Sequence, residues 1–199
     1  MARTRTPGRR EALLAAAQRV LTTQGVEKAT IDEVTAAAGM AKGTFYLYFQ
    51  SKSDLVAAMR REFAAELAEA VAGSITSDAP HDWPGTIRKL LESAADSYLA
   101  NLPLHEAVLY HGDAGEGEAG WTAEIVRALE GFITAGSKAG AFTVDDPEFT
   151  AVLLFDAIHG LFHHALHQPQ GPDRQRVVDA AWQLSVRALS CQDSGHGAS

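Results

Sequence analysis

The sequence contains very little cysteine and no long apolar run. Cys191 is the single cysteine among 199 residues, so the chain cannot form an internal disulfide. The longest apolar run, residues 151–162, falls short of the ~18 residues that a membrane-spanning helix needs. The N-terminus is rich in Arg and Thr and lacks the apolar core of a secretory signal peptide. These absences predict a cytoplasmic protein that does not enter a membrane.

Recognisable catalytic motifs are also missing. Ser, His and Asp are all present, but no G-x-S-x-G elbow, P-loop or dinucleotide-binding fingerprint organises them. We therefore expect no enzymatic activity and no cofactor. The alternation of apolar and polar residues that is typical of half-buried strands is absent as well. The sequence predicts an all-α protein.

Charge is distributed unevenly along the chain. The net charge of −8 argues at first against a polyanionic partner. Residues 1–61, however, carry ten Lys or Arg against five Asp or Glu, whereas residues 62–199 carry a net charge of −13. A basic head on an acidic body favours a head that meets nucleic acid and a body that does not.

Apolar spacing and capping residues predict a series of helices. Gly25 is expected to end the first helix, and Thr30 with Glu33 matches a capping box that starts the second. Gly39 is expected to end this second helix, in a short turn that makes a helix–turn–helix with the third. The Gly-rich stretch 112–120 is expected to be mobile. The expected helices comprise residues 9–24, 31–38, 41–49, 51–72, 85–101, 103–111, 121–139, 147–167 and 172–190.

Aromatic residues cluster in the stretch KGTFYLYFQSK, residues 42–52. Phe45 and Phe49 are four residues apart, so on a helix they share one face, which we expect to pack inside the head. Lys42 and Lys52 flank the cluster. The remaining side chains are expected to point outward or sideways: Thr44, Tyr46, Leu47 and Tyr48. The cluster would thus hold the head together and also face a partner.

One segment, residues 29–55, combines a Thr-capped helix, an Ala-rich turn with glycine, and a Gly-Thr-aromatic-Tyr-x-Tyr-Phe run. Its sequence is ATIDEVTAAAGMAKGTFYLYFQSKSDL. In these features the chain resembles the tetracycline-repressor (TetR) family of bacterial transcription regulators. The resemblance implies a three-helix DNA-binding head, residues 1–52, on a larger helical ligand-binding and dimerisation body, residues 53–191. A disordered tail, residues 192–199, is expected to follow. The implied function is a ligand-responsive regulator, a repressor that a small-molecule effector releases from its DNA operator.

The resemblance also implies which residues meet DNA. Residues 42–48 would lie in the major groove, and Lys42 is the residue among them that resembles a usual guanine reader. Lys52 and the arm 3–10 would contact phosphate, as would the Thr30 hydroxyl at a helix N-terminus. The predicted DNA-binding residues are Thr30, Lys42, Gly43, Thr44, Tyr46, Leu47, Tyr48 and Lys52.

An effector pocket within the helical body is implied in the same way. A ligand bound there would move the long helix 51–72 and so weaken operator binding. Aromatic residues would suit an apolar effector, although Asp96 and Glu106 leave a cationic one open. The candidate ligand-binding residues are Tyr98, His105, Tyr110, Trp121, Phe155 and His159.

The last two predicted helices have unusually broad apolar surfaces. Residues 148–167 are apolar almost all round, and residues 172–190 carry only a narrow polar stripe. Such helices must be covered on more than one side, so we expect a homodimer through them. A two-fold dimer would bind a palindromic operator.

Histidines in the sequence DAIHGLFHHALH leave a metal site as an alternative. Asp156, His159 and His163 recur at helical spacing, with His164 and His167 nearby. Imidazoles one turn apart can chelate a transition metal, with a carboxylate as a third ligand. The alternative function is a metal-sensing regulator or a metal-binding protein. The single cysteine and the absence of a second ligand cluster favour the other interpretation, in which the histidines line a dimer interface or lie at an exposed helix end.

Overall fold

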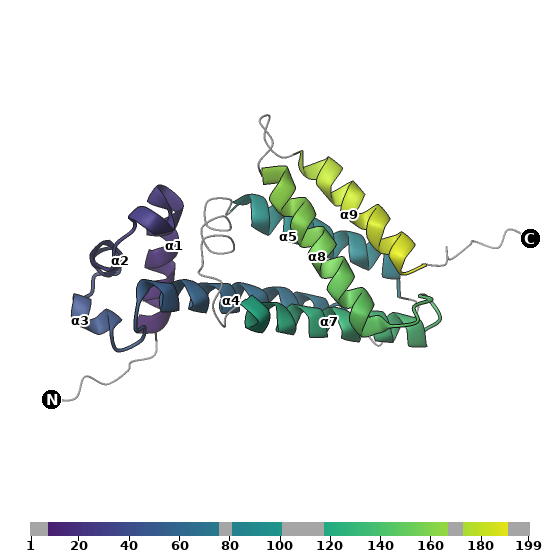
Figure 1. Cartoon of the computed structure of the whole chain (residues 1–199), viewed down its shortest axis with the longest axis horizontal. Helices are drawn as coiled ribbons and strands as arrows, with labels where there is room; N and C mark the ends of the chain where they lie inside the picture. Colours follow the sequence, from purple (N-terminus) through teal and green to yellow (C-terminus); the bar gives the residue numbers. More distant parts are fainter. Residues whose placement is uncertain (1–7, 76–80, 101–117, 167–172, 191–199) are drawn as a thin grey trace, which may run out of the picture. The chain divides into compact units, whose positions relative to one another are not determined.

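The computed structural model describes residues 8–75, 81–100, 118–166 and 173–190, and over these ranges it is helical without any strand (Figure 1). This confirms the predicted all-α class. The helices are α1 (Arg9–Lys28), α2 (Ile31–Ala37), α3 (Lys42–Phe45), α4 (Lys52–Gly73), α5 (Trp83–Ala100), α7 (Glu118–Lys138), α8 (Pro147–Leu166) and α9 (Arg174–Ala188). The predicted helix 103–111 and the tail 192–199 lie outside the described residues. Most of the stretch 112–120 does too, but its last three residues open α7.

Two compact units make up the chain. One consists of Met1–Phe63 with Ala100–Trp121, and the other of Ala64–Leu99 with Thr122–Ser199. Helix α4 contributes residues to both units. The domain boundaries at residues 52 and 191 remain predictions.

Helix ends follow the predicted capping residues closely. Gly25 has a φ of 81°, which interrupts the helical backbone of α1 where the sequence predicts an end. Asp146 accepts a hydrogen bond from the Phe149 N–H at 3.0 Å and so caps the N-terminus of α8, which begins at the predicted residue 147. Helix α5 begins two residues before its predicted start because Asp82 caps it, accepting from the Gly85 N–H at 2.9 Å.

An aromatic cluster anchors the second unit around α5 and α7. The Trp83 ring lies 5.2 Å from the Phe132 ring and 5.3 Å from the Phe142 ring, centroid to centroid, in edge-to-face arrangements. Phe142 follows α7, and its N–H and that of Ala141 both donate to the Gly136 carbonyl. The chain therefore folds back over α7 at Gly136, and Phe142 closes the cluster.

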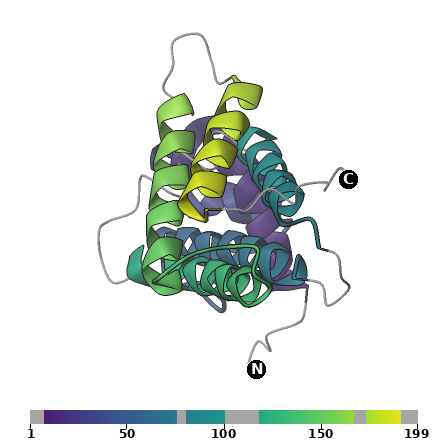
Figure 2. The ribbon, with the colours of Figure 1, turned by 90° about the vertical axis from the view of Figure 1, so that its right-hand side faces the viewer.

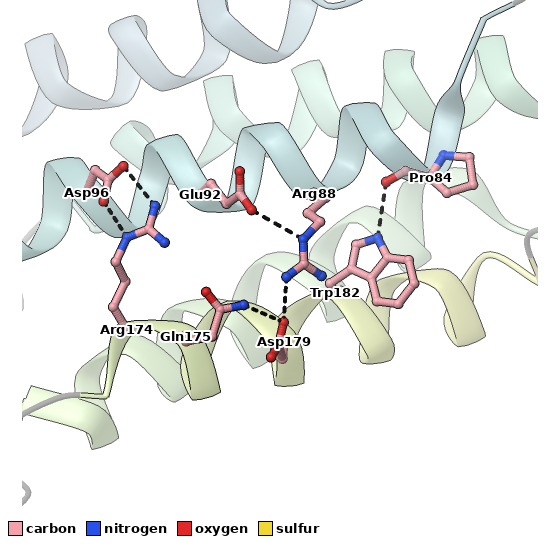
Figure 3. Close-up of polar contacts among 8 residues, drawn as sticks. All are labelled: Pro84, Arg88, Glu92, Asp96, Arg174, Gln175, Asp179 and Trp182. Atoms are coloured by element: carbon pink, nitrogen blue, oxygen red, sulfur yellow. Dashed lines mark hydrogen bonds and ion pairs between the residues drawn. The ribbon is translucent and has the colours of Figure 1, made fainter.

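Polar contacts join α5 to α9 in the same unit (Figure 3). Arg88 pairs with Asp179 at 2.6 Å and with Glu92 at 3.2 Å, and its guanidinium lies 5.6 Å from the Trp182 ring centroid. Trp182 donates its indole N–H to the Pro84 carbonyl at 3.1 Å. The polar stripe of α9 therefore faces α5 in part, which its sequence pattern did not reveal.

Helices α8 and α9 run side by side (Figures 1 and 2). Each buries part of its apolar surface within the unit: Ala151, Leu154, Phe155, Phe162, Val178 and Ala181. Each also leaves a large apolar side chain in solvent. Phe149 and Leu153 of α8 are 60% and 55% exposed, and Leu184 of α9 is 41% exposed. Among the helices described, none has the length and apolar character to cross a membrane.

Candidate nucleic-acid interface

The turn between α2 and α3 is set by Gly39. Its φ of 66° lies in the left-handed region that glycine enters without steric cost. The Met40 N–H donates to the Thr35 carbonyl at 2.8 Å, and the Thr35 hydroxyl, itself buried, donates back into α2 at the Ile31 carbonyl. The predicted end of the second helix is confirmed, and α3 leaves the turn in a fixed direction.

Helix α3 is shorter than the predicted helix 41–49. It ends at Phe45, and the next turn is tightened, with the Tyr48 N–H donating to the Phe45 carbonyl at 2.9 Å. The physical reason lies at the start of α4, where the Ser51 hydroxyl accepts from the Asp54 N–H and Asp54 accepts from the Gln50 N–H. Because this cap occupies residues 50–54, the chain must leave the helix before it.

The aromatic cluster divides as predicted between core and surface. Phe45 is fully buried and Phe49 is 3% exposed, and both belong to the core that α1, α2 and α4 share. Tyr46 lies on the opposite side and is 53% exposed. Leu47 and Tyr48 are half-buried, and Tyr48 packs partly against the core. Tyr46 is therefore the most exposed aromatic side chain of α3 and the turn that follows it.

Lys42 lies one helical turn before Tyr46 and is paired with Asp32. Its Nζ is 2.9 Å from Asp32 Oδ1 and 3.0 Å from Oδ2, and both side chains are mostly exposed. The hydrogen bond to the Asp32 carboxylate, followed by its charge, raises the pKa of Lys42 above its ordinary value. Asp32 was not among the predicted site residues. Ten residues and a turn separate it from Lys42, so no helical spacing signals the pair.

Two residues that the sequence predicts to contact DNA, Thr44 and Lys52, do not lie where that prediction requires. Thr44 was expected to face outward, but its side chain is only 3% exposed, so that orientation is wrong. Helix α3 presents residue 44 to the core together with its neighbour Phe45.

Lys52 was expected to contact phosphate, but its ammonium is occupied within the protein. It donates to the carbonyls of Val26, Glu27 and Ala29 at 2.7, 3.2 and 2.9 Å. An ammonium has three donors, and these three contacts use all of them. Lys52 thus caps the C-terminal end of α1, and its predicted phosphate contact is not supported.

Thr30 forms the predicted capping box with Glu33. The Thr30 hydroxyl accepts from the Glu33 N–H at 3.2 Å, and the Thr30 N–H donates to the Glu33 carboxylate at 2.8 Å. Hydrogen bonds from the Thr30 hydroxyl and N–H lower the pKa of Glu33.

The exposed Gly43 lies in α3 as expected. In the predicted basic arm 3–10, residues 3–7 lie outside the described ranges, and Arg10 pairs with Glu62.

The predicted effector residues are only partly described. Tyr98 and Phe155 are buried, Tyr98 stacks on Phe162 at 5.1 Å between ring centroids, and Phe155 stacks on His159 at 5.6 Å. His105, Tyr110 and the side chain of Trp121 lie outside the described part of the chain. A cavity of about 10 Å³, roughly the room one water needs, is lined by residues of α5, α8 and α9: Ala95, Tyr98, Leu99, Phe162, Ala165, Arg174 and Val177.

Asp96 does not offer a free carboxylate to a cationic effector. Arg174 of α9 donates its Nε–H to Asp96 Oδ1 at 2.5 Å and an Nη2–H to Oδ2 at 2.9 Å (Figure 3). The hydrogen bond from Arg174 lowers the pKa of Asp96. Glu106 lies outside the described residues.

The histidine cluster of α8 does not assemble a metal centre in the part of the chain that the structure describes. No group of three His, Cys, Asp or Glu side chains there is placed to hold a metal ion. Asp156 and His164 are exposed, and the His159 ring stacks on Phe155. His167 lies beyond the described end of α8.

The family comparison matches the N-terminal domain. Residues 13–59 fit the family described as bacterial regulatory proteins, tetR family. The protein YvdT of Bacillus subtilis (strain 168), an uncharacterized HTH-type transcriptional regulator, is 37% identical over 73 residues. This match covers 37% of the present chain and 38% of YvdT, well under half of either protein.

Solved structures resemble the chain over nearly its whole length. SmeT, the repressor of the Stenotrophomonas maltophilia multidrug efflux pump SmeDEF, superposes with a TM-score of 0.74 at 21% identity, over 93% of this chain and 91% of SmeT. FadR from Bacillus subtilis, in complex with stearoyl-CoA, gives a TM-score of 0.74 at 18% identity, over 90% of this chain and 97% of FadR. At these identities the likeness shows a shared fold.

Proposed function

We propose that this chain is a member of the tetR family of bacterial regulatory proteins, whose model matches residues 13–59, and that it is a transcription regulator that binds an operator as a homodimer. It would act as a repressor that a small-molecule effector releases from DNA. It would not be an enzyme. The observation that carries the proposal is the division of α3 and the turn after it. Phe45 and Phe49 are buried in the head, while Lys42 and Tyr46 stand in solvent on the other side.

The exposed face has the chemistry that the major groove requires. The groove is about 12 Å wide and admits a helix, and lysine donates to the acceptors of guanine. The Tyr46 hydroxyl can donate to phosphate or to a base edge. Gly43 lies between them and leaves room for close approach of the backbone. We propose Lys42, Gly43 and Tyr46 as the central contacts, with Leu47, Tyr48 and Thr30 at their margin.

A gel shift against DNA from upstream of the gene, repeated over a salt series, tests this function directly. Binding should weaken steeply with salt, with a slope in log K against log salt of about −0.9 for each phosphate neutralised. The Tyr46→Ala variant should bind about tenfold more weakly, a loss of roughly 1.4 kcal/mol, because it removes an exposed contact and leaves Phe45 in place.

Lys89→Ala serves as the control, because Lys89 is exposed on α5 and lies outside the head. Its operator affinity should equal that of the parent. Undiminished binding by Tyr46→Ala, with its thermal unfolding unchanged, would show that α3 is not the reading element.

Exposed apolar side chains on α8 and α9 support the proposed homodimer. Phe149, Leu153 and Leu184 leave apolar surface in water that a second copy of the same helices would cover. A two-fold contact pairs the same surface on both subunits, so covering it needs no other protein.

Leu153→Lys is expected to weaken the dimer at least about tenfold, because it places a charge where the partner would bury an apolar side chain. Sedimentation at several protein concentrations measures the change. Glu124→Lys, at an exposed position of α7, adds a lysine elsewhere and should leave the dimer intact. A Leu153→Lys protein that stays dimeric at the parent's concentrations would place the interface on another surface.

The effector is proposed to be largely apolar. FadR has been solved with stearoyl-CoA and SmeT with triclosan, and both ligands have extensive apolar surface. In this chain the buried rings of Tyr98 and Phe155, with His159 beside Phe155, remain the described candidates for its pocket. The small cavity beside Tyr98 would have to widen, because a drug-sized ligand needs roughly 300 Å³ or more.

A further inference from the structure

The ion pair between Lys42 and Asp32 lies on the surface proposed to meet DNA. Both carboxylate oxygens of Asp32 are within 3.0 Å of Lys42 Nζ. The Lys42 side chain is 53% exposed and the Asp32 side chain is 66% exposed. An exposed pair of this kind contributes little to folding, because water solvates both charges well. The head already has a complete core without it, since Phe45 and Val34 are buried beneath the two helices.

The pair presents a donor and an acceptor side by side, one hydrogen-bond length apart. The major-groove edge of a G·C base pair presents the complementary pattern. Guanine offers the acceptors O6 and N7, and cytosine offers the N4 amino donor. Guanine O6 and cytosine N4 are hydrogen-bonded to each other, so they too are about 2.9 Å apart. A charged donor and a charged acceptor at this separation can therefore meet both bases of one pair.

We propose that Lys42 and Asp32 together read one G·C base pair in each half of the operator. Lys42 donates to guanine O6 and N7, and Asp32 accepts from cytosine N4. This inference rests on the proposed DNA binding and adds a specificity residue, Asp32, to it. An A·T pair puts the adenine amino donor where Lys42 would meet guanine O6, and the thymine O4 acceptor opposite Asp32. The contacts to O6 and to N4 therefore fail together, and only the contact to the purine N7 remains.

Asp32 also acts against binding to arbitrary DNA. Its carboxylate repels phosphate, and it holds the Lys42 ammonium away from the nearest phosphate. Specificity is a difference between affinities, so a group that penalises the wrong sequence raises it as effectively as a new contact does. Both effects come from the same side chain, and one substitution removes both.

The test begins with selection of bound fragments from a random duplex library by the full-length protein. The selected half-site should contain one invariant G·C pair. Changing that pair to A·T should weaken binding by the parent about tenfold, the effect of one good pair of base contacts. The Asp32→Asn variant should lose less than about threefold on the same change, because the amide oxygen can accept from cytosine N4 and the amide NH2 can donate to thymine O4.

Asp32→Asn should also bind a duplex of mixed sequence more tightly than the parent. Its salt slope should steepen by about 0.9, because Lys42 becomes available to a phosphate. Glu11→Gln carries the same change in charge at an exposed position of α1 and should reproduce neither effect.

Two outcomes would overturn the inference in distinguishable ways. The first is a selected half-site that has no invariant G·C pair, or one whose G·C preference is unchanged in Asp32→Asn. This result would refute the reading of one base pair by Lys42 and Asp32 and would leave the DNA-binding function intact. Failure of the parent to retain any fragment at low salt would refute the proposed function itself, and this inference with it.

Discussion

Replacing Lys52 by methionine is expected to destabilise the head by about 3 kcal/mol. The ammonium of Lys52 donates to three backbone carbonyls at the end of α1, and hydrogen bonds from a charged donor are worth roughly 1.5–3 kcal/mol each in favourable cases. We expect a loss below the sum of about 4.5–9 kcal/mol for three such bonds, because Lys52 is half-exposed and water solvates part of its charge. Methionine fills a similar volume but leaves these carbonyls without their donor.

Trp83 and Trp182 belong to the second unit, so their fluorescence does not report directly on the head. Amide hydrogen exchange in α1 and α2 is the suitable measurement. Protection there should fall by about two orders of magnitude in Lys52→Met.

Lys28→Met provides the matched control, because Lys28 is exposed in the last turn of the same helix. It should lose only the small interaction of a cation with the helix terminus, roughly 0.3–1 kcal/mol. Equal losses in the two variants would mean that the three carbonyl contacts of Lys52 do not stabilise the head. A Lys52→Met protein that kept full protection but lost DNA binding would restore the phosphate-contact interpretation.

Replacing Gly136 by alanine is expected to destabilise the second unit by about 2 kcal/mol. A Cβ at this position would lie 2.2 Å from Cδ2 and Cε2 of Phe142, well inside van der Waals contact. Phe142 is 4% exposed and is held by the rings of Trp83 and Phe132, so it cannot turn away freely. Overpacking a filled core typically costs about 1–3 kcal/mol.

Gly131→Ala makes the same substitution in the same helix and is expected to have the opposite effect on stability. A Cβ at Gly131 would meet no atom within 4 Å, so alanine should stabilise α7 by up to about 1 kcal/mol through its higher helix propensity. Chemical denaturation followed by tryptophan fluorescence measures both variants, because Trp83 lies in the affected cluster. Stabilisation by both substitutions would show that Phe142 yields at little cost.

Much of the head could be predicted because its determinants are local. Thr30 and Glu33 are three residues apart, and Gly25 and Gly39 adopt left-handed backbone where a helix must stop. The inward face of Phe45 and Phe49 follows from their four-residue spacing. Each of these features depends on residues within one or two turns of helix, so the pattern is readable in the chain itself.

The errors arose where a side chain meets a distant segment. Thr44 was expected to face outward, yet the way α3 lies against the core buries it. Lys52 was expected to face DNA, yet it reaches back more than twenty residues to the end of α1. Asp32 was not predicted as a site residue, because its partner Lys42 lies on the other side of the turn. Position in a motif did not determine what these polar groups contact.

By itself, the sequence determined the helical class, the helix caps, the helix–turn–helix and the two faces of its aromatic cluster. These follow from periodicity and from backbone preferences, which act over a few residues. Only the tertiary structure decided that Lys52 holds α1, that Asp32 holds Lys42, and that Arg174 neutralises Asp96. Hydrogen bonds and ion pairs act over about 3 Å in space without regard to separation along the chain, so a polar residue's role is set by the fold that surrounds it.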